Sequence, residues 1–403
     1  MSHGIIGIGA MGYNLALNLD NKFDMHVYNR TPEKMKELIK CTTKTKGHES
    51  MCEMISTMQK PRTIMTVVPH GQPSDDVIQH LMKTMDPQDT IIDCSNEHYN
   101  ASRKRADFCS SRHIKYLGAG ISGGAIGALH GPAMMLGGPR HYYDEQKNFL
   151  NSFCSNVVYM GPSAGDGHYT KMVHNGIEYG MLQGMADIFA YCNQKPENMK
   201  QVLSKLRETD VDGPIIRYAW DILDKFDVSQ ISDVAEMNGT GLWCVQLGLE
   251  MGIPTPVMSS AVNARIASRY SRSIESSENA NVFFDATLAA QALRFLFAMS
   301  INEGYDLASI RPIKHKKVQK AWSKGTIIEC PMITKDTKPV LDETLLDTRY
   351  FVMHCTRSGI PCPAIQAALT HYDFLAQRNT SMNFVMAQRN FFGKHEVNYL
   401  HVG

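Results

Sequence analysis

The sequence predicts an α/β domain with a doubly wound parallel sheet, followed by a large all-α domain and an extended C-terminal tail. Short apolar runs alternate with helical patterns up to about residue 166, as expected of strands joined by crossover helices. Beyond that point strand-like runs are scarce, and long stretches carry Ala, Leu, Met, Gln and Glu at helical spacing. The length of 403 residues also exceeds what one core usually serves. We therefore predict domains at 1–166 and 167–372, with the tail at 373–403.

The expected elements follow from local composition. Strand segments are short, rich in β-branched or aromatic residues, and end near Gly, Asn, Ser or Pro; they span 4–9, 25–29, 62–68, 89–95 and 114–120. Right-handed crossovers should join them into a parallel sheet. The clearest helical segments of the second domain span 171–192, 196–208, 241–251 and 283–302. The tail mixes basic and aromatic residues, and we do not expect it to fold on its own.

The composition argues against several classes of partner. Lysine plus arginine (41) balance aspartate plus glutamate (40), so no overall charge attracts the chain to nucleic acid or to an anionic membrane. No apolar run reaches 18 residues, and the ten cysteines form no CxxC pair. We expect reduced, buried thiols rather than a disulfide framework, and a cytoplasmic protein with no membrane partner.

The first expected strand leads into Gly7-x-Gly9-x-x-Gly12, and a helical pattern follows. In this context the motif binds a dinucleotide. The first glycine makes the tight turn, the second lets the backbone approach a pyrophosphate, and the third lets the helix pack closely on the strand. The N–H groups at the start of the helix then bind the phosphate. The motif predicts a Rossmann-type domain; the alternative is an ordinary glycine-rich turn.

The end of the second expected strand indicates which dinucleotide binds. NAD sites usually place a carboxylate there to bind the ribose 2′-hydroxyl. This chain has Asn29, Arg30 and Thr31 instead, and a guanidinium with a hydroxyl suits a 2′-phosphate. We therefore predict NADP as the cofactor. The alternative is that Arg30 is a solvated loop charge.

Further contacts are expected at the carboxyl ends of other strands, because sheets of this kind bind ligands there. The predicted cofactor contacts are Gly7, Gly9, Ala10, Met11, Gly12, Asn29, Arg30, Thr31, Val68 and Asn96. Taken alone, an asparagine such as Asn96 more often forms a turn. Ser122, Gly123 and Gly124 could present a hydroxyl and backbone N–H groups to a carboxylate, and the alternative is a flexible loop.

The segment 171–180, KMVHNGIEYG, gathers polar side chains on one side of an expected helix. Lys171, Asn175, Glu178 and Tyr179 fall at i, i+4, i+7 and i+8, with His174 beside them. Two helical turns separate Lys171 from Glu178 by about 10 Å along the axis, so a six-carbon chain would fit between their tips. This spacing suits one group that takes a proton and another that gives one. A surface helix with an incidental lysine–glutamate pair is the alternative.

Three glycines of the same helix, Gly176, Gly180 and Gly184, recur at every fourth residue. Each glycine costs about 1 kcal/mol relative to alanine in a helix interior. We expect this stripe to let another backbone pack closely, which would explain why the helix tolerates the cost.

Several of these strings together resemble 6-phosphogluconate dehydrogenase. The matching strings are GISGG…HGPAMMLGG, KMVHNGIEYG, NGTGLW, AWSKGTIIE and AQRNFFGKH, in the family's order and over nearly the whole chain. The resemblance implies NADP-dependent oxidative decarboxylation of 6-phosphogluconate to ribulose 5-phosphate and CO2, a step of the pentose phosphate pathway. It also implies a homodimer in which the tail of one subunit reaches into the site of the other.

The resemblance further implies roles for individual residues. Lys171 matches the general base and Glu178 the general acid, and no metal is required. The residues that match substrate contacts are Asn96, Ser122, Gly123, Gly124, His174, Asn175, Tyr179, Thr240 and Arg265 of one subunit, with Arg389 and His395 of the other. Within this set, Tyr179, Thr240, Arg265, Arg389 and His395 match the pocket for the substrate phosphate.

Some positions depart from the family pattern. Asn238 stands where the family usually has a lysine, which removes a charge-assisted bond typically worth about 1.5–3 kcal/mol. Ala125 and Ile126 replace a pair of glutamates, Pro69 replaces a lysine near the cofactor, and Cys94–Ser95 replace two glycines. The chain is also some tens of residues shorter than most relatives. Two alternatives stay open: a related β-hydroxyacid dehydrogenase for a less phosphorylated acid, and a catalytically silent homologue that binds nucleotide or sugar phosphate.

Overall fold

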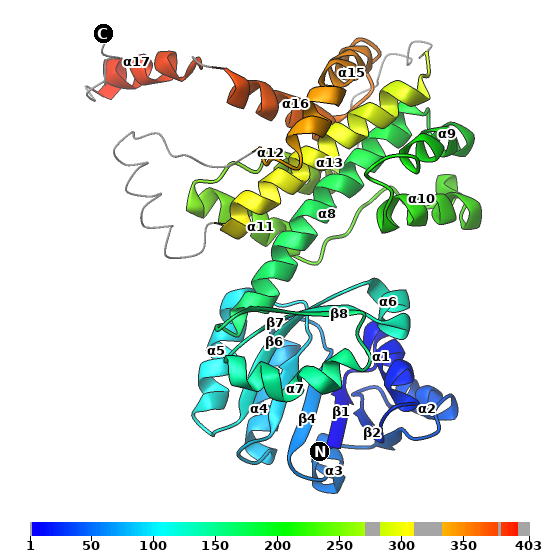
Figure 1. The fold of residues 1–403 in the computed structure, drawn as a ribbon, viewed down its shortest axis with the longest axis vertical. Coiled ribbons are helices and arrows are strands. Elements are labelled where there is room, and N and C mark those ends of the chain that lie inside the picture. The colour runs from blue at the N-terminus through cyan, green and yellow to red at the C-terminus, as the bar shows by residue number, and fades with distance from the viewer. Residues whose placement is uncertain (1, 271–282, 310–332, 378–379, 394–403) are drawn as a thin grey trace. The chain divides into compact units, whose positions relative to one another are not determined.

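The computed structural model describes residues 2–270, 283–309, 333–377 and 380–393, and these form two compact units (Figure 1). The first unit comprises Met1–Gly176 and Met237–Glu250, and the second comprises Ile177–Glu236 and Met251–Gly403. A short segment from the helical half of the sequence therefore belongs to the first unit. The string at 321–329 and the predicted substrate contact His395 lie outside the described residues.

The first unit is built on an eight-stranded sheet with strand order β3-β2-β1-β4-β5-β6-β7-β8. The strands span Ser2–Ile6 (β1), Met25–Tyr28 (β2), Lys46–His48 (β3), Arg62–Thr66 (β4), Thr90–Asp93 (β5), Lys115–Ser122 (β6), Ala133–Gly137 (β7) and Asn156–Gly161 (β8). All five expected strands are confirmed, and the structure adds β3, β7 and β8. The strand β3 is only three residues long, and β7 lies among glycines that conceal its pattern.

The strand β7 runs antiparallel to β6, so the expectation of a wholly parallel sheet is wrong at this point. The pairing of Ser122 with Ala133 shows that the chain re-enters the sheet at the edge where β6 left it. Between them lies only the short helix α6, Gly124–His130. A parallel return needs a crossover of a dozen residues or more, which this connection does not supply.

Helices cover both faces of the sheet, as a doubly wound fold requires. Within the first unit they span Ala10–Asp20 (α1), Pro32–Lys40 (α2), Met51–Thr57 (α3), Gln72–Thr84 (α4), Tyr99–Ser110 (α5) and Arg140–Asn151 (α7). Adjacent residues of β1 enter different cores: Ile5 packs in a cluster with Leu15, and Ile6 packs in another with Met54. Because successive strand residues point to opposite faces, both faces are buried, which confirms the α/β fold class.

The described residues of the second unit form helices joined by loops, which confirms the predicted all-α part. Its helices span Pro196–Leu206 (α9), Pro214–Lys225 (α10), Pro256–Ala267 (α12), Ala286–Ser309 (α13), Lys338–Arg357 (α15), Pro363–Ala376 (α16) and Met382–Gly393 (α17), with a 3₁₀ turn at Val228–Gln230. Helix α8, Gly165–Tyr191, starts in the first unit and continues into the second, and α11, Thr240–Met251, forms most of the segment that belongs to the first unit. Residues 292–300 of α13 are all buried, so this helix forms the centre of the unit.

Most described cysteines are buried free thiols, as expected. The exceptions are Cys41 and Cys52, which are exposed, and Cys154, which is half-buried; the prediction of burial is wrong for the first two. Cys330 lies outside the described residues. Among the described residues, no helix is both long and apolar enough to cross a membrane.

A buried carboxyl links two helices of the second unit. Asp187 of α8 accepts hydrogen bonds from the backbone N–H groups of Ala364 (2.8 Å) and Ile365 (3.1 Å) at the start of α16. Burial raises the pKa of Asp187 to about 7, although these hydrogen bonds oppose the shift. The folded chain therefore holds this proton at pH values where an unfolded chain has lost it.

A titration of stability should follow from this carboxyl. The free energy of unfolding is expected to fall as the pH rises from about 4 to about 7, because the folded pKa lies above the unfolded one. Asp187→Asn keeps the side chain neutral at every pH. We expect this variant to raise Tm by about 3 °C or more at pH 8, and to change it little at pH 4, in paired thermal scans. The same Tm difference at both pH values would contradict the raised pKa.

Candidate active site

The glycine-rich loop after β1 has the geometry that its three glycines predict. Gly7 has φ +100°, and a Cβ there would lie 2.3 Å from the carbonyl oxygen of Val67. A Cβ on Gly12 would lie 1.9 Å from the carbonyl oxygen of Gly7, so only glycine lets α1 pack this close to the loop. At Gly9 a Cβ would meet nothing within 4 Å. The space over Gly9 is therefore open to an approaching ligand, whereas Gly7 and Gly12 serve the fold of the loop.

Asn29 holds this loop in place from the end of β2. Its Oδ1 accepts a hydrogen bond from the N–H of Ile8 (2.8 Å), and its Nδ2 donates to the carbonyl of Thr31 (2.8 Å). A carboxylate at position 29 could accept the first bond but could not donate the second. The residue type that argues for NADP therefore also fits the local hydrogen bonds of the loop.

A cavity of about 460 Å³ lies beside the loop. Six predicted cofactor contacts line it, namely Gly7, Gly9, Asn29, Arg30, Thr31 and Val68, whereas Ala10, Met11, Gly12 and Asn96 are not among its lining residues. Asn96 is half-buried in the loop after β5. The lining also includes Lys34, which the sequence reasoning missed although it lies four residues after Arg30 in the first turn of α2. One carboxylate, Asp76, is part of the lining as well.

A buried ion cluster ties together the loops that follow β4 and β5. The Arg105 guanidinium contacts Asp93 (3.1 Å), Glu97 (2.8 Å) and Asp75 (2.7 Å). Glu97 also accepts hydrogen bonds from the N–H of Gly71 (2.9 Å) and from its neighbour His98 (2.8 Å). Burial alone would raise the pKa of Glu97, but these hydrogen bonds and the charge of Arg105 outweigh it and lower the pKa. The carboxylate form therefore fixes both loops, which carry Val68 and Asn96.

Helix α8 begins against two glycines of β6. A Cβ on Gly120 would lie 2.4 Å from Cβ of Lys171, and one on Gly118 would lie 2.1 Å from the carbonyl oxygen of Ala164. Larger residues in this strand would therefore push the helix away. The contact places Lys171 beside the end of β6, where Ser122, Gly123 and Gly124 follow. Gly123 and Gly124 have φ +116° and +60°, so the predicted loop is an ordered strand-to-helix turn.

A chain of hydrogen bonds connects four residues of the first unit that the sequence reasoning assigned to the substrate. Ser122 Oγ lies 3.4 Å from His174 Nε2, and His174 Nδ1 lies 3.2 Å from Asn175 Oδ1. Asn175 Nδ2 then donates to Thr240 Oγ1 (3.2 Å). The bonds are consistent when His174 carries its proton on Nδ1 and accepts from the Ser122 hydroxyl. The structure thus gathers two hydroxyls, one imidazole and one amide, and Lys171 lies one helical turn before His174.

In the second unit, the structure brings Tyr179 and Arg265 together. The guanidinium carbon of Arg265 lies 3.9 Å from the centre of the Tyr179 ring, and its Nη1 donates to the carbonyl of Ala261 (3.1 Å). Burial lowers the pKa of Arg265, while Tyr179 and Glu178 oppose the shift. Glu178 is half-buried, and Arg389 is exposed on α17. The contact with the Tyr179 ring fixes the plane of the Arg265 guanidinium, and a planar cation of this kind is suited to binding an anionic group.

The glycine stripe of α8 packs against side chains rather than against another backbone. A Cβ on Gly180 would lie 2.5 Å from Ser300 Oγ, and one on Gly184 would lie 2.7 Å from a methyl carbon of Leu296. Ser300 also donates to the carbonyl of Ile177 (2.9 Å). The expectation of a close backbone is therefore wrong at these two glycines, which make room for side chains of α13.

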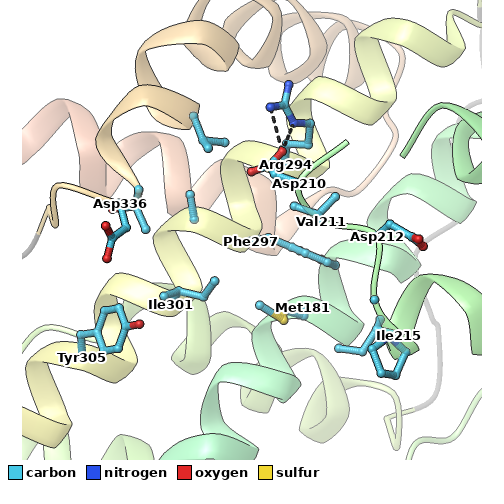
Figure 2. Close-up of a pocket in the computed structure, with 15 residues that line it drawn as sticks. Met181, Asp210, Val211, Asp212, Ile215, Arg294, Phe297, Ile301, Tyr305 and Asp336 are labelled. Atoms are coloured by element: carbon cyan, nitrogen blue, oxygen red, sulfur yellow. Dashed lines mark hydrogen bonds and ion pairs between the residues drawn. The ribbon is translucent and has the colours of Figure 1, made fainter. Parts of the chain in front are cut away.

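A second cavity, of about 410 Å³, lies within the second unit (Figure 2). Its walls are largely apolar, with Phe297 and Ile301 of α13 facing Met181 of α8. At one end Arg294 pairs with Asp210 (2.8 Å). None of the predicted site residues lines this cavity, so it is distinct from the groups described above.

Comparison with known proteins matches both halves of the chain. Residues 2–161 match the model for the NAD binding domain of 6-phosphogluconate dehydrogenase, and residues 167–343 and 309–402 match the model for the C-terminal domain of the same enzyme. The chain belongs to the 6-phosphogluconate dehydrogenase family. A relative from Synechococcus elongatus, named 6-phosphogluconate dehydrogenase, decarboxylating, is 30% identical, with 97% of this chain and 95% of the relative covered.

Two further similar proteins are also 6-phosphogluconate dehydrogenases. The Bacillus subtilis protein, named 6-phosphogluconate dehydrogenase, NADP(+)-dependent, decarboxylating, is 29% identical, with 97% of this chain and 95% of that protein covered. The solved structure of Plasmodium falciparum 6-phosphogluconate dehydrogenase is similar with a TM-score of 0.83 at 28% identity, covering 100% of this chain and 98% of the other. That enzyme was solved in its apo form, in complex with its cofactor NADP+ and in complex with its substrate 6-phosphogluconate.

Within the family, the structure gives physical roles to two of the departures. Asn238 Oδ1 accepts a hydrogen bond from the Thr240 hydroxyl (2.8 Å), so the side chain at the position where the resemblance predicts a lysine orients Thr240. Pro69, at another such position, lines the cavity beside the glycine-rich loop. Nothing in the structure explains the pair Ala125 and Ile126, of which Ile126 is 65% exposed on α6.

Proposed function

We propose that this chain catalyses the NADP-dependent oxidative decarboxylation of 6-phosphogluconate to ribulose 5-phosphate and CO2. The observation that carries the proposal is the hydrogen-bonded set Ser122, His174, Asn175 and Thr240, with Lys171 on the same helix as His174. Its groups suit a polyhydroxy acid, because they can donate to and accept from several hydroxyls and a carboxylate. Membership of the family, shown over nearly the whole chain, supports the same substrate.

The cavity beside the glycine loop suits NADP. The open space over Gly9 would admit the pyrophosphate, and Arg30 with Lys34 would bind the 2′-phosphate. NADP would supply the acceptor for the hydride that leaves the substrate. Asp76 in the lining would repel a phosphate placed next to it, so we assign the 2′-phosphate to the end of the cavity formed by Arg30, Thr31 and Lys34.

Arg30→Ala is therefore expected to raise the Kd for NADP by about tenfold or more, because a charge-assisted bond to the 2′-phosphate is lost. The Kd for NAD, which lacks this phosphate, should change little. Titration of protein fluorescence with each nucleotide measures both constants. Lys36→Ala, an exposed lysine of the same helix outside the cavity lining, is the matched control. Equal weakening of NADP and NAD would remove Arg30 from the 2′-phosphate site.

In the proposed reaction, Lys171 accepts the proton of the substrate 3-hydroxyl as the hydride leaves C3. The resulting 3-keto acid loses CO2, and Lys171 returns its proton to the carbonyl oxygen. Glu178 then protonates C1 of the enediol, which was C2 of the acid, while the enediol C2 hydroxyl gives its proton to Lys171 and becomes the ketone of ribulose 5-phosphate. A lysine acts as a base only when neutral, so closure around the substrate or a nearby cation must favour its uncharged form. The half-buried state of Lys171 is consistent with such partial desolvation.

For the substrate phosphate we propose Tyr179 with Arg265, together with Thr240, the residues that the family resemblance assigns to this role. Arg265 supplies a cation whose plane is already fixed by the Tyr179 ring. Arg265→Ala is expected to lower kcat/KM for 6-phosphogluconate by about 10–100-fold, because a bond to a charged group is lost. The value for gluconate should stay within about twofold of the unmodified protein, since gluconate has no phosphate.

Steady-state kinetics with both acids checks this assignment. Arg269→Ala, an exposed arginine just after the end of α12, is the matched control and should leave both values unchanged. A variant that loses activity equally on 6-phosphogluconate and gluconate would place Arg265 outside the phosphate site.

We further propose that the chain acts as a homodimer in the cytoplasm, with Arg389 and His395 completing the partner's phosphate pocket. The helix α17 supports the dimer: it buries none of its residues, and Phe391 and Phe392 are 84% and 82% exposed. An isolated apolar helix of this kind gains stability when its phenylalanines pack on another surface. Light scattering of the purified protein measures the mass directly.

The decisive test of the function is the absorbance of NADPH at 340 nm with purified protein, run with NADP and with NAD on 6-phosphogluconate. We expect NADPH formation accompanied by release of CO2. No absorbance change at saturating substrate would overturn the enzyme assignment in favour of a binding protein.

A second candidate is a related dehydrogenase for an acid without a phosphate. It is favoured by Asn238, which supplies an amide where the family usually has a cation. Gluconate turned over with a kcat/KM equal to that of 6-phosphogluconate would establish this alternative.

A further inference from the structure

One tryptophan, in the segment that carries Thr240, contacts the loops that follow β4 and β5. Trp243 lies in Met237–Glu250, the segment that belongs to the first unit although its neighbours in sequence belong to the second. Its ring meets His70 edge-to-face at 5.2 Å and 89°, and His98 at 5.3 Å and 83°. Both histidines therefore hold the indole ring from the side of the Rossmann-type sheet.

The loops that carry the two histidines are held by the buried ion cluster. His70 directly precedes Gly71, whose N–H donates to one oxygen of Glu97 (2.9 Å). The N–H of His98 donates to the other oxygen of Glu97 (2.8 Å), and its ring accepts from the N–H of Asn100 at the start of α5 (3.2 Å). The Arg105 guanidinium forms an ion pair with the Glu97 carboxylate (2.8 Å). The indole ring thus contacts two loops whose backbones are tied to the buried Glu97.

On its other side, Trp243 packs on the turn that presents Thr240. Gly239 has φ +90°, and a Cβ there would lie 3.0 Å from the indole ring, so the ring lies against the backbone of this glycine. The backbone N–H of Trp243 also donates to the carbonyl of Gly239 (2.9 Å). Thr240 is only 1% exposed, and its hydroxyl bonds with Asn238 and Asn175. A shift of the indole ring would therefore shift Gly239 and, with it, the Thr240 hydroxyl.

We infer that Trp243 is a positioning residue that fixes Thr240 for the substrate phosphate, using the loops after β4 and β5 as its support. The same loops carry Val68 and Pro69, which line the cofactor cavity, and Asn96. The substrate-phosphate end of the site is therefore built on the structure that also forms the cofactor cavity. The inference rests on the proposed function, because it needs Thr240 to bind a phosphate.

The test compares Trp243→Ala with Trp243→Phe on two substrates. Trp243→Ala is expected to raise KM for 6-phosphogluconate by about tenfold or more, the size of one lost bond to a charged group. Its KM for gluconate and its Kd for NADP should stay within about twofold, since gluconate has no phosphate and Thr240 does not line the cavity beside the glycine-rich loop. Trp243→Phe keeps an aromatic ring for the two histidines and should recover most of the lost affinity. A general structural defect would instead change all three constants together.

A double-mutant cycle shows whether Trp243 acts through Thr240. Thr240→Val removes the hydroxyl, and adding Trp243→Ala to it should raise KM for 6-phosphogluconate by no more than about twofold further. Full additivity of the two changes would overturn the inference. Trp220→Phe, a tryptophan of the second unit that packs with Lys200 and Arg207, is the control and should change neither KM.

The outcomes separate this inference from the proposed function. If Thr240→Val raises KM for 6-phosphogluconate but Trp243→Ala does not, the positioning role fails while the phosphate site stands. If the unmodified protein does not discriminate between 6-phosphogluconate and gluconate, the phosphate site itself fails. Thermal scans of Trp243→Ala and Trp243→Phe identify unfolding, and Trp243→Phe keeps the comparison valid if the alanine variant does not fold.

Discussion

Replacing Lys171 with methionine is expected to lower the rate of NADPH formation by about a thousandfold or more, because one positioned acid–base group contributes about 10²–10⁴-fold. Methionine keeps the length and much of the apolar surface of the lysine stem, so the helix should stay against Gly120 and the Kd for NADP should not change. The effect should appear in kcat rather than in KM, because the proton transfer belongs to the chemical step. Stopped assays at saturating NADP and 6-phosphogluconate measure it.

Two controls show whether the loss of activity is specific to Lys171 and whether the variant stays folded. Lys147→Met, at an exposed lysine of α7, should keep full activity. Thermal scans should give Lys171→Met the same Tm as the unmodified chain within about 2 °C. Residual activity above a tenth of the original would show that another group, or water, takes the proton of the 3-hydroxyl.

Removing residues 382–403 is expected to abolish turnover of 6-phosphogluconate while leaving NADP binding intact. The deletion takes away α17 with Arg389 and also His395, which together complete the proposed phosphate pocket of the partner. No residue of α17 is buried in its own chain, so the remaining fold should keep its Tm. Full activity of the truncated chain would contradict a site shared between subunits.

A mixing experiment tests the sharing directly. The truncated chain keeps Lys171 but lacks the tail, and full-length Lys171→Met keeps the tail but lacks the base; each should be inactive alone. After dissociation and reassociation, half of the dimers are mixed and each contains one complete site, so about a quarter of the original activity should return. No recovery, with mixed dimers demonstrated by mass, would show that the tail serves the site of its own chain.

The sequence predicted those parts of the site that lie within one element or one loop. The glycine spacing at Gly7, Gly9 and Gly12 implied the loop geometry because each glycine meets a steric requirement set by its nearest neighbours. The polar face of α8 followed from helical periodicity alone. Pairs such as Tyr179 with Arg265, or Asn175 with Thr240, join segments remote in sequence, and they were predicted as members of one site only through the family resemblance.

The features that escaped prediction depend on tertiary contacts without a local signal. The support of Trp243 needs His70, His98, Glu97 and Arg105 to converge from two loops and a helix. The reversal of β7 depends on the length of its connection to β6 rather than on any apolar period. The exposure of Cys41 and Cys52 likewise reflects where α2 ends and α3 begins, and composition alone favours burial for cysteine.

The continuity of α8 has a consequence for protein engineering. This helix runs unbroken from Gly165 to Tyr191 and carries both Lys171 and Glu178, although the chain passes from one unit to the other between these residues. The spacing of the base and the acid is therefore a property of one helix, and no movement of the units changes it while the helix stays intact. Chimeras that exchange parts between relatives, or permuted chains with new ends, should keep this spacing when their junctions lie outside residues 165–191.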